Sequence, residues 1–137
     1  EKYREKTATL GIASRVHFLG PRPLSHMPDL FQDADILVSP RTQGANTPMK
    51  IYSYLDANRA ILATDLPTHT QVLNRDVAEL VPPTCEAMAE GMGTLLQQKE
   101  RRERLGSQAR MLAQECYSLR AFRAGVNRLY DYIANLP

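Results

Sequence analysis

One stretch of sequence decides the fold class: Ser39-Pro40-Arg41-Thr42-Gln43-Gly44-Ala45-Asn46-Thr47-Pro48-Met49-Lys50-Ile51-Tyr52-Ser53-Tyr54-Leu55, closing on Ala60-Ile61-Leu62-Ala63-Thr64. Its pattern predicts a buried strand, a glycine-bearing loop, a helix and a second buried strand. The helix is expected to run for about ten residues from Pro48 with Thr47 as its cap, because proline at the first helical position costs no hydrogen bond. This order places helix N-terminal amides at the carboxyl edge of a parallel sheet, where anions and phosphates bind.

The rest of the chain extends the alternation of strands and helices. Strands are predicted at residues 16–19, 36–38, 60–63 and 78–81, and helices at about 1–11, 25–34, 68–74, 84–98, 100–115 and 118–135. Strands that alternate with helices across short loops indicate an α/β fold, a Rossmann-like open parallel sheet with helices on both faces.

Composition indicates one ordinary globular domain. The chain has 137 residues, 43% hydrophobic and 23% charged, and its net charge of +2 gives no sign of a nucleic-acid partner. Charge is uneven, since eight Lys/Arg against three Asp/Glu between Lys99 and Arg128 give a local +5 and leave −3 elsewhere. We interpret these basic helices as a solvated surface, with contact to an anionic membrane or an acidic partner as the alternative.

The remaining sequence signals concern location and completeness. Cys85 and Cys116 have neither a CxxC spacing nor a nearby histidine pair, so no metal site or redox motif is predicted, and reduced thiols fit the cytoplasm. No signal peptide and no membrane span is seen. The chain begins at Glu1 in a helical register without a methionine, and we expect a piece of a longer protein.

Candidate ligand-binding residues gather between the first two strands of the deciding stretch. Glycine at 44 lets the backbone approach a ligand, Lys50 offers a point charge in the first helical turn, and Arg41 is a second cation. In the alternative reading, Gly44 only makes a turn and Lys50 only faces water. Asn46, Gln43 and Ser53 could hydrogen-bond sugar hydroxyls, and helical spacing places Ser53 on the face that carries Met49 and Lys50.

Histidines and aromatic residues give weaker signals. His69 is the strongest base or ligand candidate because it follows a strand at the ligand-binding edge; His26 lies at a helix start, and His17 is expected to be packed in a strand. Tyr52 and Tyr54 fall on opposite sides of their helix, which argues against a base-stacking platform.

At these residues the chain resembles the C-terminal domain of glycosyltransferases with two Rossmann-like domains, the GT-B architecture, and specifically the large family 4. The resemblance covers residues 10 to about 130 and rests on four segments: Val16-His17-Phe18-Leu19-Gly20, residues 30–40 with the pair Ala34-Asp35, Pro48 to Leu55 with Arg59 to Thr64, and Ala78-Glu79-Leu80-Val81-Pro82-Pro83. It implies a partial donor-binding domain over residues 1–137, with C-terminal helices at about 84–135.

The resemblance also implies a function. Such enzymes transfer a sugar from a nucleotide-diphosphate donor, usually with retention of the anomer and without a required metal or other cofactor. Arg41, Lys50 and the loop of Gly44, Ala45, Asn46 and Thr47 would face the sugar and diphosphate. Ser53 would face the ribose, and Gly20 and Pro21 would lie near the base. No catalytic residue is assigned.

Departures from the family pattern qualify these expectations. Ser53 and Ala45 occupy the positions of two family glutamates, Asn58 that of a helix-ending glycine and Ala60 that of a proline. Each lost carboxylate contact should weaken donor binding by about 1.5–3 kcal/mol. A catalytically degenerate nucleotide-binding or scaffold module is therefore a second hypothesis, and another doubly wound domain, such as an epimerase-like sheet, is a third.

The resemblance also implies that two strands of the family's sheet and its diphosphate-binding residues lie outside this chain. The family's diphosphate-binding Arg and Lys and two sheet strands precede the first residue of this chain, and those strands lie between residues 16–19 and 36–39. We therefore expect either strand re-pairing, with a homodimer formed by strand exchange as one form, or that the rest of the protein, including its N-terminal domain, is a separate piece. An enzyme of this kind would be active only with that domain.

Overall fold

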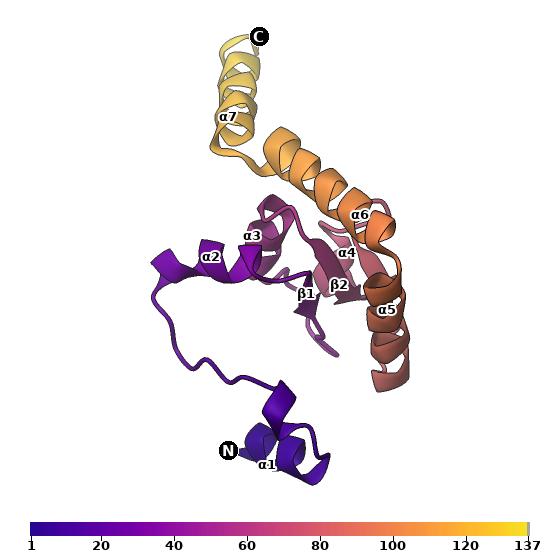
Figure 1. Cartoon of the computed structure of the whole chain (residues 1–137). Coiled ribbons are helices and arrows are strands. Elements are labelled where there is room, and N and C mark those ends of the chain that lie inside the picture. The colour runs from indigo at the N-terminus through magenta and orange to yellow at the C-terminus, as the bar shows by residue number, and fades with distance from the viewer. Residues whose placement is uncertain (137) are drawn as a thin grey trace.

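A three-stranded parallel sheet forms the centre of the molecule, a computed structural model that describes residues 1–136. Strand β1 (Ile36–Ser39) pairs with β2 (Ala60–Thr64), and β2 pairs with β3 (Glu79–Val81), in the order β1-β2-β3. Helices lie on both faces of this sheet (Figure 1). The predicted Rossmann-like α/β class is therefore confirmed.

Seven α-helices and three short helical turns accompany the strands in the described chain. The helices are α1 (Lys2–Thr9), α2 (Met27–Gln32), α3 (Lys50–Asp56), α4 (Pro67–Thr70), α5 (Cys85–Gln97), α6 (Lys99–Leu112) and α7 (Leu119–Ala134). The turns are η1 (Ala13–Arg15), η2 (Leu24–His26) and η3 (Ala113–Tyr117), of which η3 is a π turn. The three C-terminal helices match their predicted ranges to within a few residues, whereas α4 is a single turn, shorter than predicted.

The start of α3 differs from the sequence prediction. The helix begins at Lys50, two residues after Pro48, and no side chain caps it in the described chain. The predicted cap at Thr47 is wrong, because the residue at the cap position is Met49. The Ile51 amide donates instead to the Pro48 carbonyl at 3.0 Å, so a tight backbone turn starts the helix.

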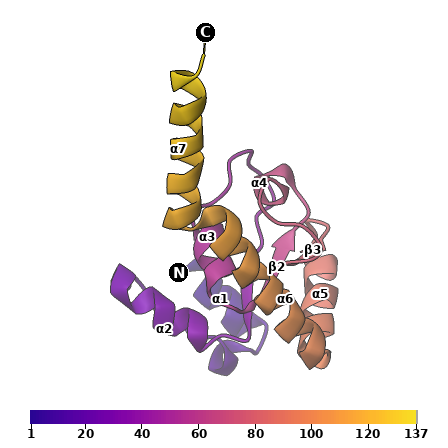
Figure 2. The ribbon, with the colours of Figure 1, turned by 90° about the horizontal axis from the view of Figure 1, so that it is seen from above.

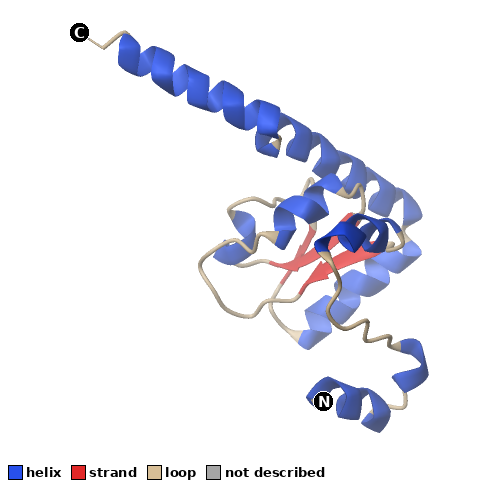
Figure 3. Cartoon of the chain, turned by 90° about the vertical axis from the view of Figure 1, so that its left-hand side faces the viewer, coloured by secondary structure: helices blue, strands red, loops and turns tan. Residues whose placement is uncertain are grey.

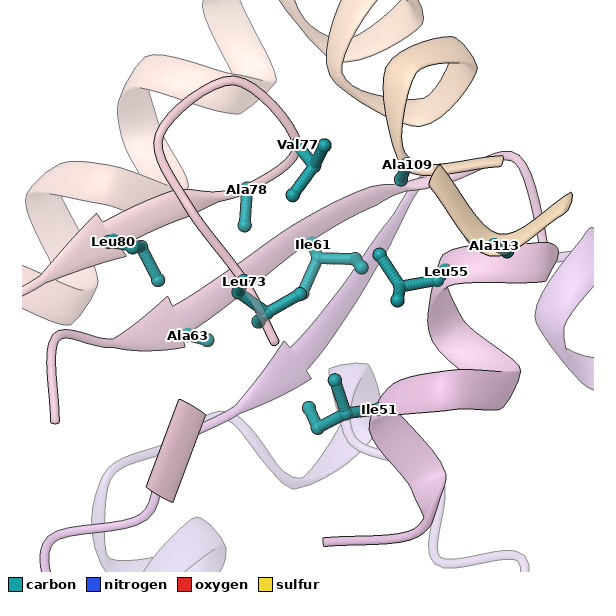
Figure 4. Packing of buried hydrophobic residues seen from close by; sticks show 10 residues of the cluster. All are labelled: Ile51, Leu55, Ile61, Ala63, Leu73, Val77, Ala78, Leu80, Ala109 and Ala113. Atoms are coloured by element: carbon teal, nitrogen blue, oxygen red, sulfur yellow. The ribbon is translucent and has the colours of Figure 1, made fainter. Parts of the chain in front are cut away.

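Two apolar clusters hold helices to opposite faces of β2. Ile61 and Ala63 belong to one cluster, and Ala60 and Leu62 belong to the other, as expected for alternate residues of a strand covered on both sides. Figure 4 shows the first cluster, in which Ile51 and Leu55 of α3 meet the sheet beside Leu73, Val77, Ala78, Leu80, Ala109 and Ala113. The core therefore fixes α3 against β2.

Close backbone packing fixes α6 beside the turn that follows α3. A Cβ at Gly106 would lie 2.8 Å from the Asn58 carbonyl oxygen, so this helix position needs glycine. Asn58 itself has φ +56°, in the left-handed region that asparagine tolerates better than most residues. Asn58 thus adopts the left-handed conformation that glycine commonly supplies just after a helix.

The N-terminal arm does not join the sheet. Residues 16–19 form no strand, and the predicted strand there is wrong. Figures 1 and 3 show the arm carrying α1 apart from the strands. No strand of residues 1–136 lies on the other edge of β1, so a partner for residues 16–19 is missing and re-pairing within the chain does not occur.

At the other end, α7 projects away from the body of the molecule (Figures 1 and 2). Ser118 caps it, since its Oγ accepts a hydrogen bond from the Ala121 amide at 3.1 Å. None of its described residues is buried, although its apolar stripe includes Leu119, Phe122, Leu129, Tyr130 and Ile133. Among residues 1–136, no helix is both long and apolar enough to cross a membrane.

Candidate functional site

The loop of residues 40–49 and helix α4 lie together at the carboxyl edge of the sheet. The loop leaves the end of β1 and α4 follows the end of β2, and these strands run parallel. The predicted location of the loop is therefore confirmed. Hydrogen bonds with residues 68 and 71 hold this loop.

The Arg41 side chain stabilises the loop of residues 40–49 through hydrogen bonds. Its Nη1 donates to the Asn46 carbonyl at 3.1 Å and to Thr68 Oγ1 at 3.0 Å, and Thr68 Oγ1 donates to the same carbonyl at 2.7 Å. Gly44 passes close over this clamp with φ +120°, and a Cβ there would lie 3.1 Å from Arg41 Nη1. Arg41 therefore shapes the loop, and Gly44 is required by both conformation and space.

A second contact, from the residue that follows α4, holds the loop one residue earlier. The Gln71 side chain donates from Nε2 to the Ala45 carbonyl at 2.5 Å. Ala45 and Asn46 thus contribute backbone oxygens to the loop's own structure, while both side chains stay exposed. Sequence reasoning missed Thr68 and Gln71; their signal was a run of polar residues, 68–71, that begins four residues after a buried strand.

His69 is buried under the loop and occupied on both ring nitrogens. Its Nε2 accepts from Ser39 Oγ at 2.9 Å, and its Nδ1 donates to the Thr64 carbonyl at 2.9 Å, an assignment that follows from the partners. Burial lowers the pKa of His69, its hydrogen bond to the Thr64 backbone opposes this, and the charges of Lys50 and Arg41 lower it further. The neutral ring therefore links the ends of β1 and β2 through hydrogen bonds, and neither ring nitrogen is available to act as a general base.

A groove of about 690 Å³ runs between α2 and α3. Met49, Lys50 and Ser53 all line it, so the predicted shared face of α3 is confirmed. The α2 side adds apolar surface, and two charged side chains that the sequence did not single out complete the lining. These further lining residues are Leu24, Met27, Pro28, Phe31, Gln32, Tyr52, Asp56, Ala57 and Arg110.

Lys50 is the cation at the loop end of this groove. Its Nζ lies 5.5 Å from the centroid of the Tyr54 ring, which itself packs edge-on against Phe31 at 5.3 Å. Although the residue as a whole is exposed, partial burial lowers the pKa of the Lys50 ammonium, and the charge of Arg41 lowers it further. An anion bound here would relieve that repulsion. Tyr52 contacts Tyr117 instead, so the two tyrosines of α3 do point apart.

Other sequence candidates lie away from this groove. Gly20 and Pro21 are exposed in the segment before η2 and do not line the groove. In this part of the chain, Leu24 of η2 lines it instead. His17 and His26 are exposed, and the expectation that His17 is packed is wrong because its segment forms no strand. Cys85 and Cys116 are free thiols. Among the described residues, no group of His, Cys, Asp or Glu side chains could hold a metal ion.

Comparisons with known proteins identify the lineage. A family described as Glycosyl transferases group 1 matches residues 1–98. Among solved structures, a sucrose-phosphate synthase from Thermosynechococcus elongatus matches with a TM-score of 0.83 and 17% identity, over 96% of this chain and 33% of its own. Anabaena HepE matches in complex with UDP (TM-score 0.85) and with UDP-glucose (TM-score 0.83), each at 16% identity over 96% of this chain and 36% of its own.

This chain therefore spans about a third of the length of these structures, and at such identities the likeness shows the fold alone. No curated protein sequence matches it.

Proposed function

The chain belongs to the group 1 glycosyl transferases, and from this membership we propose that it is the donor-binding part of a glycosyltransferase. The proposed ligand is a nucleotide-diphosphate sugar, held in the groove between α2 and α3. The observation that carries the proposal is the composition of this groove, which joins a partly buried cation, a hydroxyl and a carboxylate to an apolar wall. The UDP and UDP-glucose in the HepE structures support this ligand class.

Each part of the groove suits a different part of such a donor. Lys50 would neutralise the diphosphate as a point charge, next to the loop of Gly44 and Thr47. Leu24 and Met27 offer apolar surface to the base. Ser53 would bond a ribose hydroxyl. Asp56 lies one helical turn after Ser53 in the same lining, so it supplies a carboxylate near the position where the family glutamate is absent.

We propose that sugar transfer needs more of the protein than this chain. Catalysis would be mainly electrostatic, through stabilisation of the departing nucleotide diphosphate, with retention of the anomer. The segment that the resemblance places before residue 1 would supply further cations and the strands beside the open edge of β1, and an N-terminal domain would cover the apolar stripe of α7. A homodimer formed by strand exchange is the alternative way to cover the β1 edge.

A catalytically degenerate module is the second candidate function. Ala45 has no side-chain polar group, and its carbonyl is bonded to Gln71, so nothing at this position replaces a glutamate. Ser53 offers one hydroxyl in place of a carboxylate. Such a module would bind nucleotide, or act as a scaffold, without transferring sugar.

Calorimetric titration with UDP tests the proposal. We expect binding by the chain and a loss of about tenfold in affinity for Lys50→Met, since one charge-assisted contact is removed. Lys99→Met is the matched control, because Lys99 is an exposed lysine at the start of α6 and should leave affinity unchanged. Equal effects of the two variants, or no UDP binding at all, would contradict the proposal. Binding without sugar transfer by the longer protein would favour the degenerate module.

A further inference from the structure

A buried polar network joins the ends of two strands to the loop of residues 40–49. At its centre is the ring of His69, with 0% of the residue exposed. Thr64 and Ser39, the last residues of β2 and β1, hold the ring, and both are also buried. All buried side-chain nitrogen and oxygen atoms of the described residues have hydrogen-bond partners.

From this network we infer that His69 is a positioning residue for the loop, and that its protonation loosens the loop. The inference rests on the proposed function, because it concerns the loop next to the proposed donor groove. His69 does not touch that groove. It acts through Thr64 and Arg41.

The path from the ring to the loop is a short series of hydrogen bonds. Thr64 accepts from His69 Nδ1 with its carbonyl at 2.9 Å and lies 3.0 Å from the same nitrogen with its Oγ1. The Thr64 hydroxyl donates to the Arg41 carbonyl at 2.6 Å. Arg41 and Thr68 then both donate to the Asn46 carbonyl. The backbone of the loop is thus fixed at two points, residues 41 and 46.

Protonation would change this arrangement at its centre. The neutral ring needs one donor, Ser39 Oγ, and one acceptor, the Thr64 carbonyl. A protonated ring donates from both nitrogens, so the buried Ser39 hydroxyl loses its acceptor. The new positive charge would also repel Arg41 of the loop and Lys50 of α3, the two charged groups that act on this ring. Repulsion of Arg41 weakens its clamp on Asn46.

Amide hydrogen exchange of residues 42–47 in the free chain tests this inference, corrected for the intrinsic effect of pH. On acidification from about pH 8 through the titration of the His69 ring, followed by its nuclear magnetic resonance signals, we expect protection of these amides to fall about tenfold in the unmodified chain. His69→Gln should remove this response, and His17→Gln, which alters an exposed histidine, should retain it. Constant protection in the unmodified chain, or an unchanged response in His69→Gln, would overturn the inference.

Two further measurements test the role of His69 independently of whether the His69→Gln variant folds. Thr68→Val removes the hydroxyl at the end of the path, and its loop should exchange rapidly at every pH. If His69→Gln fails to fold, the ring signals of the unmodified chain should titrate with the same midpoint as loop amide protection, and different midpoints would overturn the inference. UDP affinity should fall together with loop protection; absence of UDP binding at any pH would contradict the proposed function while the exchange data still decide the inference.

Discussion

The carboxyl edge of the sheet and the two ends of the chain differ in whether their side chains and backbone find partners within the chain. At the edge, Ser39, Thr64, Thr68 and His69 are all buried polar residues with partners inside the molecule. At the ends, apolar side chains of α7 stay in solvent, with Phe122 67% exposed, and residues 16–19 have no neighbouring strand. The polar groups of the sheet edge thus find their hydrogen-bond partners within this chain, whereas apolar side chains of α7 remain exposed to solvent.

Truncation of a core residue should cause the largest loss in the free energy of unfolding, whereas truncation on α7 should cause almost none. Leu55→Ala removes a side chain with 0% exposure from the cluster between α3 and β2, and we expect a loss of about 2–5 kcal/mol in the free energy of unfolding. Leu129→Ala, on the exposed stripe of α7, is the matched control and should cost less than about 0.5 kcal/mol. Urea unfolding measures both variants. Similar losses would mean that α7 packs against the body in solution.

Insertion of one methyl group at the loop should have the next largest effect. Gly44→Ala meets both a φ of +120° and the Arg41 guanidinium at 3.1 Å, and we expect a cost of about 1–3 kcal/mol. Gly93→Ala places its methyl in open space in the middle of α5 and should stabilise by about 0.5–1 kcal/mol. Thermal unfolding compares the two. A neutral Gly44→Ala variant would show that the Arg41 clamp is not rigid.

Acid should lower the stability of the chain through His69 at the carboxyl edge of the sheet. Since the pKa of His69 is lowered by folding, the unfolded chain binds more protons, and stability falls as pH drops from about 6.5, the ordinary histidine value, toward the folded pKa. The effect is the smallest of the three, because one group titrates. Unfolding free energies measured at several pH values should decline over this window in the unmodified chain. They should decline less in His69→Gln, and an equal decline would assign the effect to other groups.

Sequence patterns predicted an element well where its own apolar pattern was strong and its partners were present in the chain. The apolar runs of β1, β2 and β3 and the periodicity of α5 to α7 identified these elements directly. The prediction at residues 16–19 failed because a strand exists only beside another strand. Its residues have strand-forming character but no partner in the described chain.

Site prediction was limited by contacts between distant residues. The shared face of Lys50 and Ser53 followed from helical spacing and is confirmed in the groove. Arg41 looked like a ligand contact, whereas its partner Thr68 lies 27 residues away in sequence, beyond any local pattern. The α2 wall and Arg110 of α6 enter the groove only through tertiary packing, so no motif could indicate them.

Nuclear magnetic resonance mapping of UDP on the labelled chain tests the central claim most directly, because it reports where the nucleotide lies. We predict amide shifts at Met49, Lys50 and Ser53 together with Leu24 and Met27, on the two walls of the α2–α3 groove. Shifts confined to the basic face of α6, or no shifts at saturating UDP, would contradict this claim.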